Sequence, residues 1–390
     1  MADVVIVGAA RTPIGGFQGV FDDVSAAALG GIALKAALEG AGCPTVDEVI
    51  MGCVLPAGQG QAPARQAGFA AGFSEAVPAT TLNKMCGSGM RAAMVGFDQI
   101  ALGQINLVAA GGMESMSNAP HLLPKMRGGA RIGHTQVVDH MLFDGLEDAY
   151  ENGRLMGSYA EDCAEKFQLT RKAQDSYALG SLSNARAAQQ VGAFSAEIAP
   201  VTLKTRRGDV VVDADEQLAT ARPEKIPHLR PAFRDGGTVT PANSSSISDG
   251  AAALIIASDG YAKADGLKVR ARVLGYSSHA QAPGWFSTAP VPAAKKLLER
   301  VGWKVEDVDL WEINEAFAVV PMVFMQELRL AREKVNVNGG ACALGHPIGA
   351  SGARIIVTLL NALETRGLQR GVAAICIGGG EGMALAIERV

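Results

Sequence analysis

Cysteine is scarce in this chain, and the cysteines present do not form the pairs that disulfide or metal sites need. Six cysteines in 390 residues are too few for a disulfide-stapled scaffold. No CxxC pair occurs, so a zinc ribbon is not expected. Reduced thiols are typical of cytosolic proteins, and the sequence therefore predicts a cytoplasmic location. The six are Cys43, Cys53, Cys86, Cys163, Cys342 and Cys376.

The chain also lacks an excess of charge and a long apolar run. Lys plus Arg number 35 and Asp plus Glu 39, a net charge of −4, so nucleic acid is not an expected partner. A local basic pocket for a phosphate ligand stays open. The longest apolar stretch of the second half, 316–325, is too short to span a bilayer and contains Pro321. No basic region precedes the short apolar run at the N-terminus, so neither a secretory signal nor a membrane contact is predicted.

Glycine, by contrast, is abundant, with 47 residues, which indicates tight turns and close approach of backbones. Hydrophobic residues at 48% and charged residues at 19% indicate a globular chain with a large core. Short strand-like apolar runs alternate with helical faces, such as the face from Met90 to Ala101. The pattern predicts an α/β protein with mostly parallel sheets.

Two parts of the sequence repeat the same order of signals: Gly-rich turn, helix, strand and a second Gly-rich turn. Ser88–Arg91 (SGMR) resembles Ser351–Arg354 (SGAR). In the same way GGME at 111–114 resembles GGGE at 378–381. We therefore predict two duplicated βα halves.

The middle of the chain differs from both halves. It carries more charge, Gly and Pro, with a polar helix predicted over Arg171–Gln190 and a loop-rich stretch from Pro200 to Pro241. We interpret residues 119–246 as an inserted domain that covers the site. The predicted halves are residues 1–118, completed by about 247–268, and residues 269–390.

Four residues are candidates for chemistry. Cys86 stands in a Gly-rich turn at the predicted start of a helix, where unpaired N–H groups favour an anion, so its thiol pKa is expected to fall. His346, in the second Gly-rich turn, is a candidate base for a thiol. Cys376 ends a strand before three glycines, and sites of α/β sheets form at such strand ends. Asn314 lies at a strand-to-helix turn, where it caps the helix or holds a polar group.

Each candidate has a structural alternative. Cys86 and Cys376 fit buried, inert cysteines, and His346 fits a turn histidine bonded to backbone. The early string GAARTPIGG lacks the GxGxxG spacing, so a dinucleotide site is not predicted.

Five motifs, in order, resemble those of the thiolase family over the whole length of the chain. They are NKMCGSG at 83–89, GGMESMS at 111–117, NEAFA at 314–318, GHPIGASG at 345–352 and CIGGG at 376–380. Within the family the sequence is most similar to the acetyl-CoA acetyltransferase, or acetoacetyl-CoA thiolase, type. The resemblance implies a thiolase-like α/β fold, with a layered αβαβα core and an inserted loop domain that binds coenzyme A. It implies reversible Claisen condensation of two acetyl-CoA to acetoacetyl-CoA and free CoA.

The resemblance also implies roles for the candidates. Cys86 forms an acetyl-enzyme, and His346 takes the proton of its thiol. Cys376 is the second acid/base, acting at the α-carbon of acetyl-CoA. One oxyanion site uses His346 with a water held by Asn314, and the other uses the N–H groups of Cys86 and Gly378.

Coenzyme A is expected as substrate and product, with no resident cofactor and no metal. By resemblance, the substrate contacts are Leu146, Met156, Leu229, Phe233, Ser245, Phe286, Ala316 and Phe317. Basic residues concentrate in the insertion without singling out a phosphate ligand. They are Lys204, Arg206, Arg207, Arg222, Lys225, Arg230 and Arg234. A homodimer or homotetramer is expected from the family.

Four positions depart from the pattern of many relatives. Leu155 stands where histidine is common, Glu381 where glutamine is common, and Cys342 where an aliphatic is frequent. The aromatic residue Phe286 resembles the one found at this place in a group of thiolases, some of which accept substrates with a 2-methyl branch. Chain length and branching therefore stay open, and a broader-chain thiolase of β-oxidation is one alternative. A ketoacyl synthase of the same fold is another, against which Cys376 argues, and a non-catalytic acyl-CoA carrier is the third.

Overall fold

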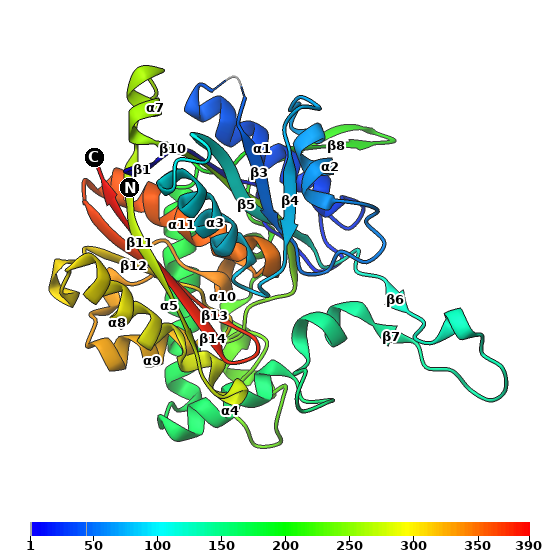
Figure 1. Ribbon diagram of the computed structural model, residues 1–390. Coiled ribbons are helices and arrows are strands. Elements are labelled where there is room, and N and C mark those ends of the chain that lie inside the picture. Colours follow the sequence, from blue (N-terminus) through cyan, green and yellow to red (C-terminus); the bar gives the residue numbers. More distant parts are fainter. Residues whose placement is uncertain (1, 44) are drawn as a thin grey trace.

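The structure is a computed structural model that describes residues 2–43 and 45–390 (Figure 1). Its body consists of two halves with matching elements. The first half contains β1 (Val4–Arg11), α1 (Ala26–Ala41), β3 (Glu48–Gly52), α3 (Ser88–Ala101), β5 (Leu107–Ser115) and β10 (Ser248–Ser258). The second contains β11 (Ala271–Ala280), α8 (Pro290–Val301), β12 (Leu310–Ile313), α11 (Ile348–Arg366), β13 (Arg370–Ile377) and β14 (Glu381–Arg389).

The two halves order their strands in the same way. The first runs β1-β10-β5-β3 and the second runs β11-β14-β13-β12. In each, the first two neighbouring pairs are antiparallel and the third is parallel. The same order with the same directions confirms the predicted duplication. A short pairing of β1 with β11 joins the halves into one sheet, which ends in β12 on one side and β4 (Ala79–Leu82) on the other.

The prediction of mostly parallel sheets is wrong. Among the named strands of the described chain, the parallel pairs are β3 with β4, β3 with β5, and β12 with β13. The last strand of each half, β10 or β14, runs antiparallel to the strand before it, β5 or β13. Antiparallel strand pairs therefore outnumber parallel ones. β14 does so through the tight turn 378–380, in which Gly379 and Gly380 have φ of +90° and +86°. The alternation of strands and helices along the sequence does not predict in which direction such a final strand runs.

Helices and sheets stack in layers around three apolar clusters. α1 and α2 (Pro63–Ala70) pack on the outer face of the first half. α8 and α9 (Val319–Leu328) pack on the outer face of the second. α3 and α11 lie side by side between the halves, as Figure 1 shows. α11 is buried from Ile348 to Leu363, which explains why apolar and small residues occupy most of its faces.

Glycines allow the two central helices to touch at their backbones. A Cβ on Gly89 of α3 would lie 2.7 Å from the backbone N of Ala353 in α11. A Cβ on Gly352 of α11 would lie 2.4 Å from the backbone N of Met90 in α3. Both glycines belong to the repeated SGMR and SGAR strings. The repeat therefore marks the helix crossing, where only a missing side chain permits this approach.

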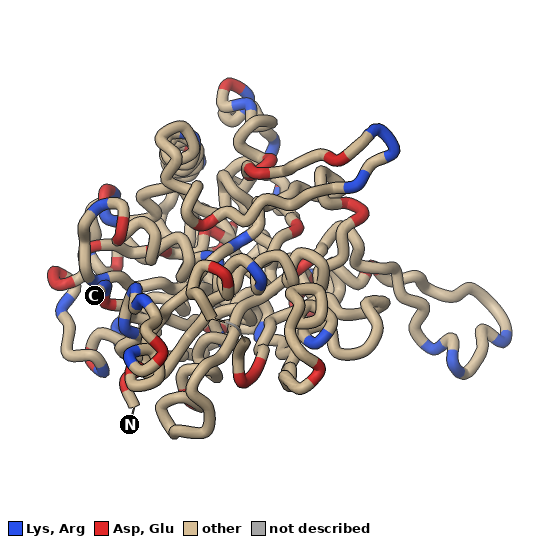
Figure 2. Tube along the Cα trace, turned by 90° about the horizontal axis from the view of Figure 1, so that it is seen from above, with Lys and Arg blue, Asp and Glu red and all other residues tan. Residues whose placement is uncertain are grey.

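The segment between β5 and β10 projects two extensions. One is an arm around β6 (His121–Leu122) and β7 (Val138–Asp139), which Figure 1 shows pointing away from the body. The other is the hairpin of β8 (Val201–Thr205) and β9 (Gly208–Val212). Lys and Arg colour the outer parts of both in Figure 2. The remaining elements are η1 (Met126–Gly128), η2 (Leu142–Leu146), α4 (Met156–Lys166), α5 (Arg171–Gln190), α6 (Glu216–Thr220) and η3 (Pro223–His228).

Several sequence expectations for this segment can be compared directly with the structure. The helix predicted over Arg171–Gln190 is α5, with the same bounds, and Thr170 caps it by accepting the N–H of Ala173. The stretch from Pro200 to Pro241 is less irregular than expected, since it holds the β8–β9 hairpin and α6. No helix within the described ranges combines the length and apolarity needed to cross a membrane.

Replacing Gly352 by Ala should destabilise the fold, because the new Cβ meets the backbone of α3, which cannot move aside cheaply. We expect a loss of about 1–3 kcal/mol in the free energy of unfolding, measured in urea. Gly180→Ala in α5 is the matched control, since a Cβ there meets nothing within 4 Å. Helix propensity should make the control more stable, by up to about 1 kcal/mol. Equal stability of the two variants would contradict the helix-crossing argument.

Candidate active site

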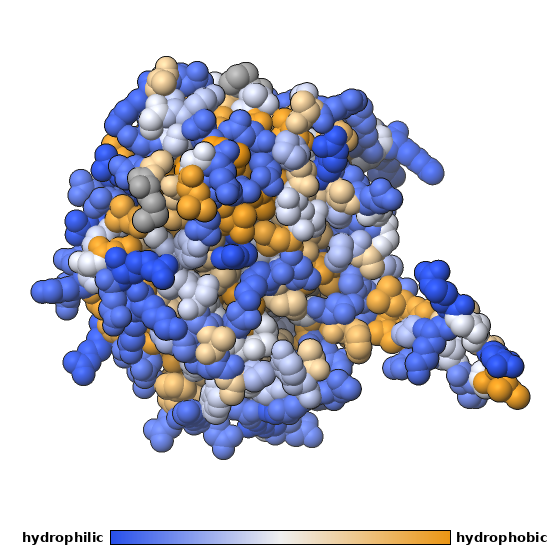
Figure 3. Space-filling model, viewed as in Figure 1, coloured by the Kyte–Doolittle hydropathy of each residue, from blue (hydrophilic) through white to orange (hydrophobic). Residues whose placement is uncertain are grey.

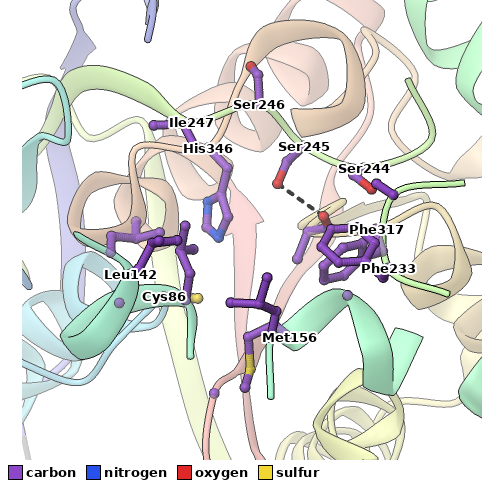
Figure 4. A pocket seen from close by; sticks show the side chains of 18 of the residues that line it. Cys86, Leu142, Met156, Phe233, Ser244, Ser245, Ser246, Ile247, Phe317 and His346 are labelled. Carbon is purple, nitrogen blue, oxygen red and sulfur yellow. Dashed lines mark hydrogen bonds between the residues drawn. The ribbon is translucent and has the colours of Figure 1, made fainter. Parts of the chain in front are cut away.

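A mostly apolar cavity of about 390 Å³ lies where the two halves meet the inserted segment. Cys86, His346 and Gly378 line it, and each comes from a different Gly-rich turn. Figure 4 shows the Cys86 thiol and the His346 ring projecting into the same space. Residues far apart along the chain thus meet in one enclosed volume, as the predicted chemistry requires.

The turn that carries Cys86 is built by short polar side chains. Asn83 Oδ1 accepts the N–H of Met85 at 2.9 Å, and Ser88 Oγ accepts the N–H of Lys84 at 2.8 Å. The Ser88 hydroxyl also donates to the carbonyl of Met85 at 2.7 Å. These bonds hold Met85 at φ +49°, an uncommon backbone conformation for a residue with a side chain. The result is a sharp elbow that presents Cys86 to the cavity, just before α3 begins.

His346 is oriented by bonds to both ring nitrogens. Its Nδ1 lies 2.6 Å from Ser351 Oγ, and that hydroxyl donates to the carbonyl of Pro347 at 3.0 Å. Because the hydroxyl hydrogen is used, we assign the ring proton to Nδ1. The amide nitrogen of Asn314 lies 3.4 Å from Nε2, which is then the unprotonated nitrogen. His346 therefore has the tautomer of a base. Ser351, one turn into α11, was missed by sequence reasoning, although its place five residues after a turn histidine was a usable signal.

Cys376 and Asn314 lie behind the cavity wall rather than on it. Both are fully buried, and Asn314 reaches the site through His346. Asn314 Oδ1 has no hydrogen-bond partner within the described part of the chain. Burial raises the pKa of the Cys376 thiol well above its usual value, and the charge of a Cys86 thiolate raises it further. The second thiol is thus electrostatically coupled to the first, and it lies two residues before the turn that supplies Gly378.

Burial decides the charge states of these groups. The pKa of the Cys86 thiol is raised to about 11, because burial outweighs the N–H groups of Gly378 and Cys86 that favour the thiolate. The expectation that helix geometry would lower this pKa is wrong for that reason. Burial, with the nearby Arg354, lowers the pKa of His346 to about 3. At neutral pH the resting site thus holds a neutral thiol beside a neutral imidazole.

Most of the expected substrate contacts line this cavity. They are Leu146, Met156, Phe233, Ser245, Phe286, Ala316 and Phe317. The rings of Phe233 and Phe286 both meet Phe317 edge to face, with centroids 6.0 and 6.3 Å away. The Ser245 hydroxyl donates to the carbonyl of Ala316 at 3.0 Å, the dashed line in Figure 4. Sequence reasoning missed further wall residues, since nothing in their sequence context distinguishes them from ordinary apolar or small residues. They include Met116, Leu142, Gly145, Ile247 and Ile348.

Leu229 is the exception, since it lines an adjoining cavity of about 300 Å³. That cavity shares Ser244 and Ser246 with the first and also exposes Arg222 and Lys225. The other basic candidates are dispersed. Arg234 pairs with Asp162 and Glu165, and three more basic residues, Lys204, Arg206 and Arg207, surround the turn of the β8–β9 hairpin. Nowhere in residues 2–43 and 45–390 do three His, Cys, Asp or Glu side chains gather so as to hold a metal ion.

The raised pKa of Cys86 has a direct chemical consequence. Only the thiolate reacts with iodoacetamide, so alkylation of Cys86 should accelerate about tenfold per pH unit from about pH 7 to pH 9.5. Peptide mapping identifies the alkylated residue, and the Cys86→Ala variant measures the background alkylation of the other cysteines. A rate that levels off below about pH 8 would contradict a thiol held neutral by burial.

Comparison with known proteins agrees with the geometry. Residues 4–260 match the family described as "Thiolase, N-terminal domain", and residues 267–389 match "Thiolase, C-terminal domain". Acetyl-CoA acetyltransferase 2 of Arabidopsis thaliana is 51% identical over 99% of this chain and 97% of its own length. An acetyl-CoA acetyltransferase of Cupriavidus necator is 48% identical over the whole of both chains.

Solved structures give the same result. The acetyl-CoA acetyltransferase of Bacillus anthracis has a TM-score of 0.97 at 43% identity, covering 100% of this chain and 99% of its own. Acat5 thiolase from Ascaris suum, in complex with coenzyme A, has a TM-score of 0.94 at 42% identity and full coverage of both chains. Family profile, sequence identity and fold all agree over the full length, and the chain belongs to the thiolase family.

Proposed function

We infer that the chain is an acyltransferase, an acetyl-CoA C-acetyltransferase that condenses two acetyl-CoA to acetoacetyl-CoA and CoA, reversibly. The observation that supports this function most directly is that three groups share one cavity. They are the Cys86 thiol, the unprotonated Nε2 of His346 and the N–H of Gly378. The relatives at 48–51% identity are named as acetyl-CoA acetyltransferases, which supports this activity over other thiolase reactions.

In the first half-reaction, Cys86 attacks the thioester carbonyl of acetyl-CoA. His346 Nε2 removes the thiol proton during the attack, which the neutral resting pair requires. The oxygen that becomes negative binds the N–H groups of Cys86 and Gly378. The bond between the acetyl carbon and the CoA sulfur then breaks. Cys376 donates its proton to the departing thiolate, which leaves acetyl-Cys86, an imidazolium and a Cys376 thiolate.

In the second half-reaction, the Cys376 thiolate removes an α-proton from a second acetyl-CoA. The enolate oxygen accepts a hydrogen bond from the His346 imidazolium, with Asn314 alongside it. The α-carbon attacks acetyl-Cys86, and the bond to the Cys86 sulfur breaks. His346 returns its proton to Cys86, so acetoacetyl-CoA departs and all three groups regain their resting protonation.

We propose that residues 119–246 form the unit that binds coenzyme A, and that CoA acts as substrate and product with no resident cofactor. This segment supplies Leu146, Met156, Phe233 and Ser245 to the cavity wall. Arg222 and Lys225 are suited to its phosphates, because they are cations that line the adjoining cavity together with Ser244 and Ser246.

We propose that the enzyme prefers short acyl chains and also accepts an α-methyl branch, in an apolar cavity lined by Phe233, Phe286 and Phe317. In a panel of 3-ketoacyl-CoAs, thiolysis should be fastest for acetoacetyl-CoA and its 2-methyl derivative. Fastest turnover of long chains would favour a broad β-oxidation thiolase instead.

We further propose a cytoplasmic homo-oligomer. The six cysteines are free thiols, and the proposed chemistry needs Cys86 and Cys376 reduced. β4 leaves one edge of the main sheet unpaired within this chain. Apolar side chains are exposed on the arm and near its base, including Ile132 at 98% and Phe143 at 54%. Figure 3 shows apolar colour at the tip of the arm and where it leaves the body. Light scattering that gives the mass of one chain would contradict this assembly.

The two half-reactions can be separated by mutation. Cys376→Ser should still accumulate acetyl-Cys86 with acetyl-CoA, visible by intact mass, because a thiolate can leave without being protonated. Condensation should fall about 10²–10⁴-fold, because the α-proton then has no base. Cys86→Ala should show neither adduct nor turnover. Cys163→Ser, another buried thiol, is the control and should keep both. Wild-type protein that turns over without an acetyl adduct on Cys86 would exclude the covalent mechanism.

A further inference from the structure

Two glutamates at matching places in the repeated sequence each reach across to the opposite half. Glu114 follows GGM and accepts the N–H of Gly349, in the turn after His346, at 2.9 Å. Glu381 follows GGG, and its Oε2 lies 2.6 Å from Nζ of Lys84, in the turn before Cys86. Each half thus contacts the Gly-rich turn of the other through a glutamate that follows its own Gly-rich string.

The two contacts differ in kind. Glu114 is fully buried and also accepts the N–H groups of Val54 and Leu55, so it is fixed by backbone. Glu381 and Lys84 are about one-third exposed, at 32% and 33%, and hold each other through charge. The second contact is therefore the one that a side-chain substitution can remove without opening the core.

We propose that Lys84 and Glu381 are positioning residues that hold the Cys86 turn against the 378–380 turn, and so set the place of the Gly378 N–H beside the Cys86 sulfur. This proposal rests on the proposed function for its effect on turnover. It concerns the distance between two turns, and neither side chain is assigned contact with substrate.

The glycine turn needs such a restraint. Gly379 and Gly380 both have positive φ, and glycine leaves the backbone its greatest freedom. A Cβ on Gly379 would meet nothing within 4 Å, and one on Gly378 only the sulfur of Met156, at 3.6 Å. Gly380 is tied on one side, where its carbonyl accepts the N–H of Gln281 at 2.9 Å. The Cys86 side has no comparable backbone bond in the described chain.

Besides the Gly378 N–H that favours the Cys86 thiolate, two contacts join the turns on that side. Gly87 packs tightly against apolar side chains, because a Cβ at this position would lie 2.4 Å from Met383 and 2.6 Å from Ile377. The Lys84–Glu381 pair is the one ion pair between the turns in the part of the chain described. Packing sets how closely the turns approach, and the ion pair restrains how they slide past each other.

Loss of the Lys84–Glu381 ion pair should affect stability and catalysis to different extents. A partly exposed ion pair contributes little to stability, so its loss should hardly affect unfolding. Catalysis is more sensitive, because a displacement of about 1 Å can lower a rate about 10²-fold. Loss of the pair should therefore reduce activity without reducing stability.

The experiment uses Glu381→Gln, Lys84→Gln, the double variant and the charge-swapped pair Lys84→Glu with Glu381→Lys. Each single change should lower kcat about three- to tenfold with KM nearly constant, as expected for a displacement of a fraction of an ångström. The double should be no worse than either single, and the swap should recover part of the loss. The urea concentration at the midpoint of unfolding should stay close to the wild-type value.

Glu388→Gln is the matched control. Its partner is Arg370, at 2.9 Å, the two side chains are 30% and 38% exposed, and Glu388 lies at the far end of the same strand, β14. It should leave kcat unchanged. Additive losses in the double variant, losses equal to those of Glu388→Gln, or full wild-type kcat in both singles would each overturn the proposal.

A readout without turnover separates this proposal from the function. The Gly378 N–H favours the Cys86 thiolate, so displacing it should slow alkylation of Cys86 by iodoacetamide at fixed pH in the single variants. Absence of acetyl-Cys86 in wild-type protein would overturn the proposed function while leaving this measurement intact. Unchanged alkylation in both single variants would overturn the positioning role even in an active enzyme.

Discussion

The backbone contact between α3 and α11 is the constraint on which the rest of the structure depends. Gly89 and Gly352 remove the side chains that would separate the two helices, and each lies a few residues after a Gly-rich turn. Because the helices cross near their first turns, the loops that precede them open onto the same place. One loop delivers Cys86 and the other delivers His346. A duplicated fold thereby makes one asymmetric site from two copies of the same unit.

Dehydration gives that site its chemical character. A helix start in water would favour a thiolate, but here burial raises the pKa of Cys86 and lowers that of His346, so both stay neutral. Neutral groups cost little to hold in an apolar cavity, and charge develops only as the thioester is attacked. The N–H groups of Cys86 and Gly378 are already in place when it does. Ser351 contributes by fixing the tautomer that leaves Nε2 free to accept a proton.

The sequence predicts a large share of this arrangement, because local signals mark the residues involved. The SGMR and SGAR strings identified the duplication, and periodic apolar residues identified α3. α5 kept its predicted bounds since Thr170 is a clear N-cap. Seven of the eight expected substrate contacts reached the main cavity through resemblance to thiolases, not through any local rule.

What the sequence could not supply depends on three-dimensional context. The antiparallel course of β10 and β14 is set by which neighbours they meet after long or tight connections. The thiol pKa depends on burial by residues from both halves. Leu229 falls on the adjoining cavity because the 3₁₀ segment that ends at His228 redirects the chain. The Lys84–Glu381 pair joins residues almost 300 positions apart, a distance over which one sequence carries no pairing signal.

The most direct test is a crystal structure of the Cys376→Ser variant after exposure to acetyl-CoA. The account predicts an acetyl group on Cys86 with its carbonyl oxygen within hydrogen-bond distance of the N–H groups of both Cys86 and Gly378. An acetyl oxygen that points away from Gly378, or an acetyl group on any other residue, would contradict it.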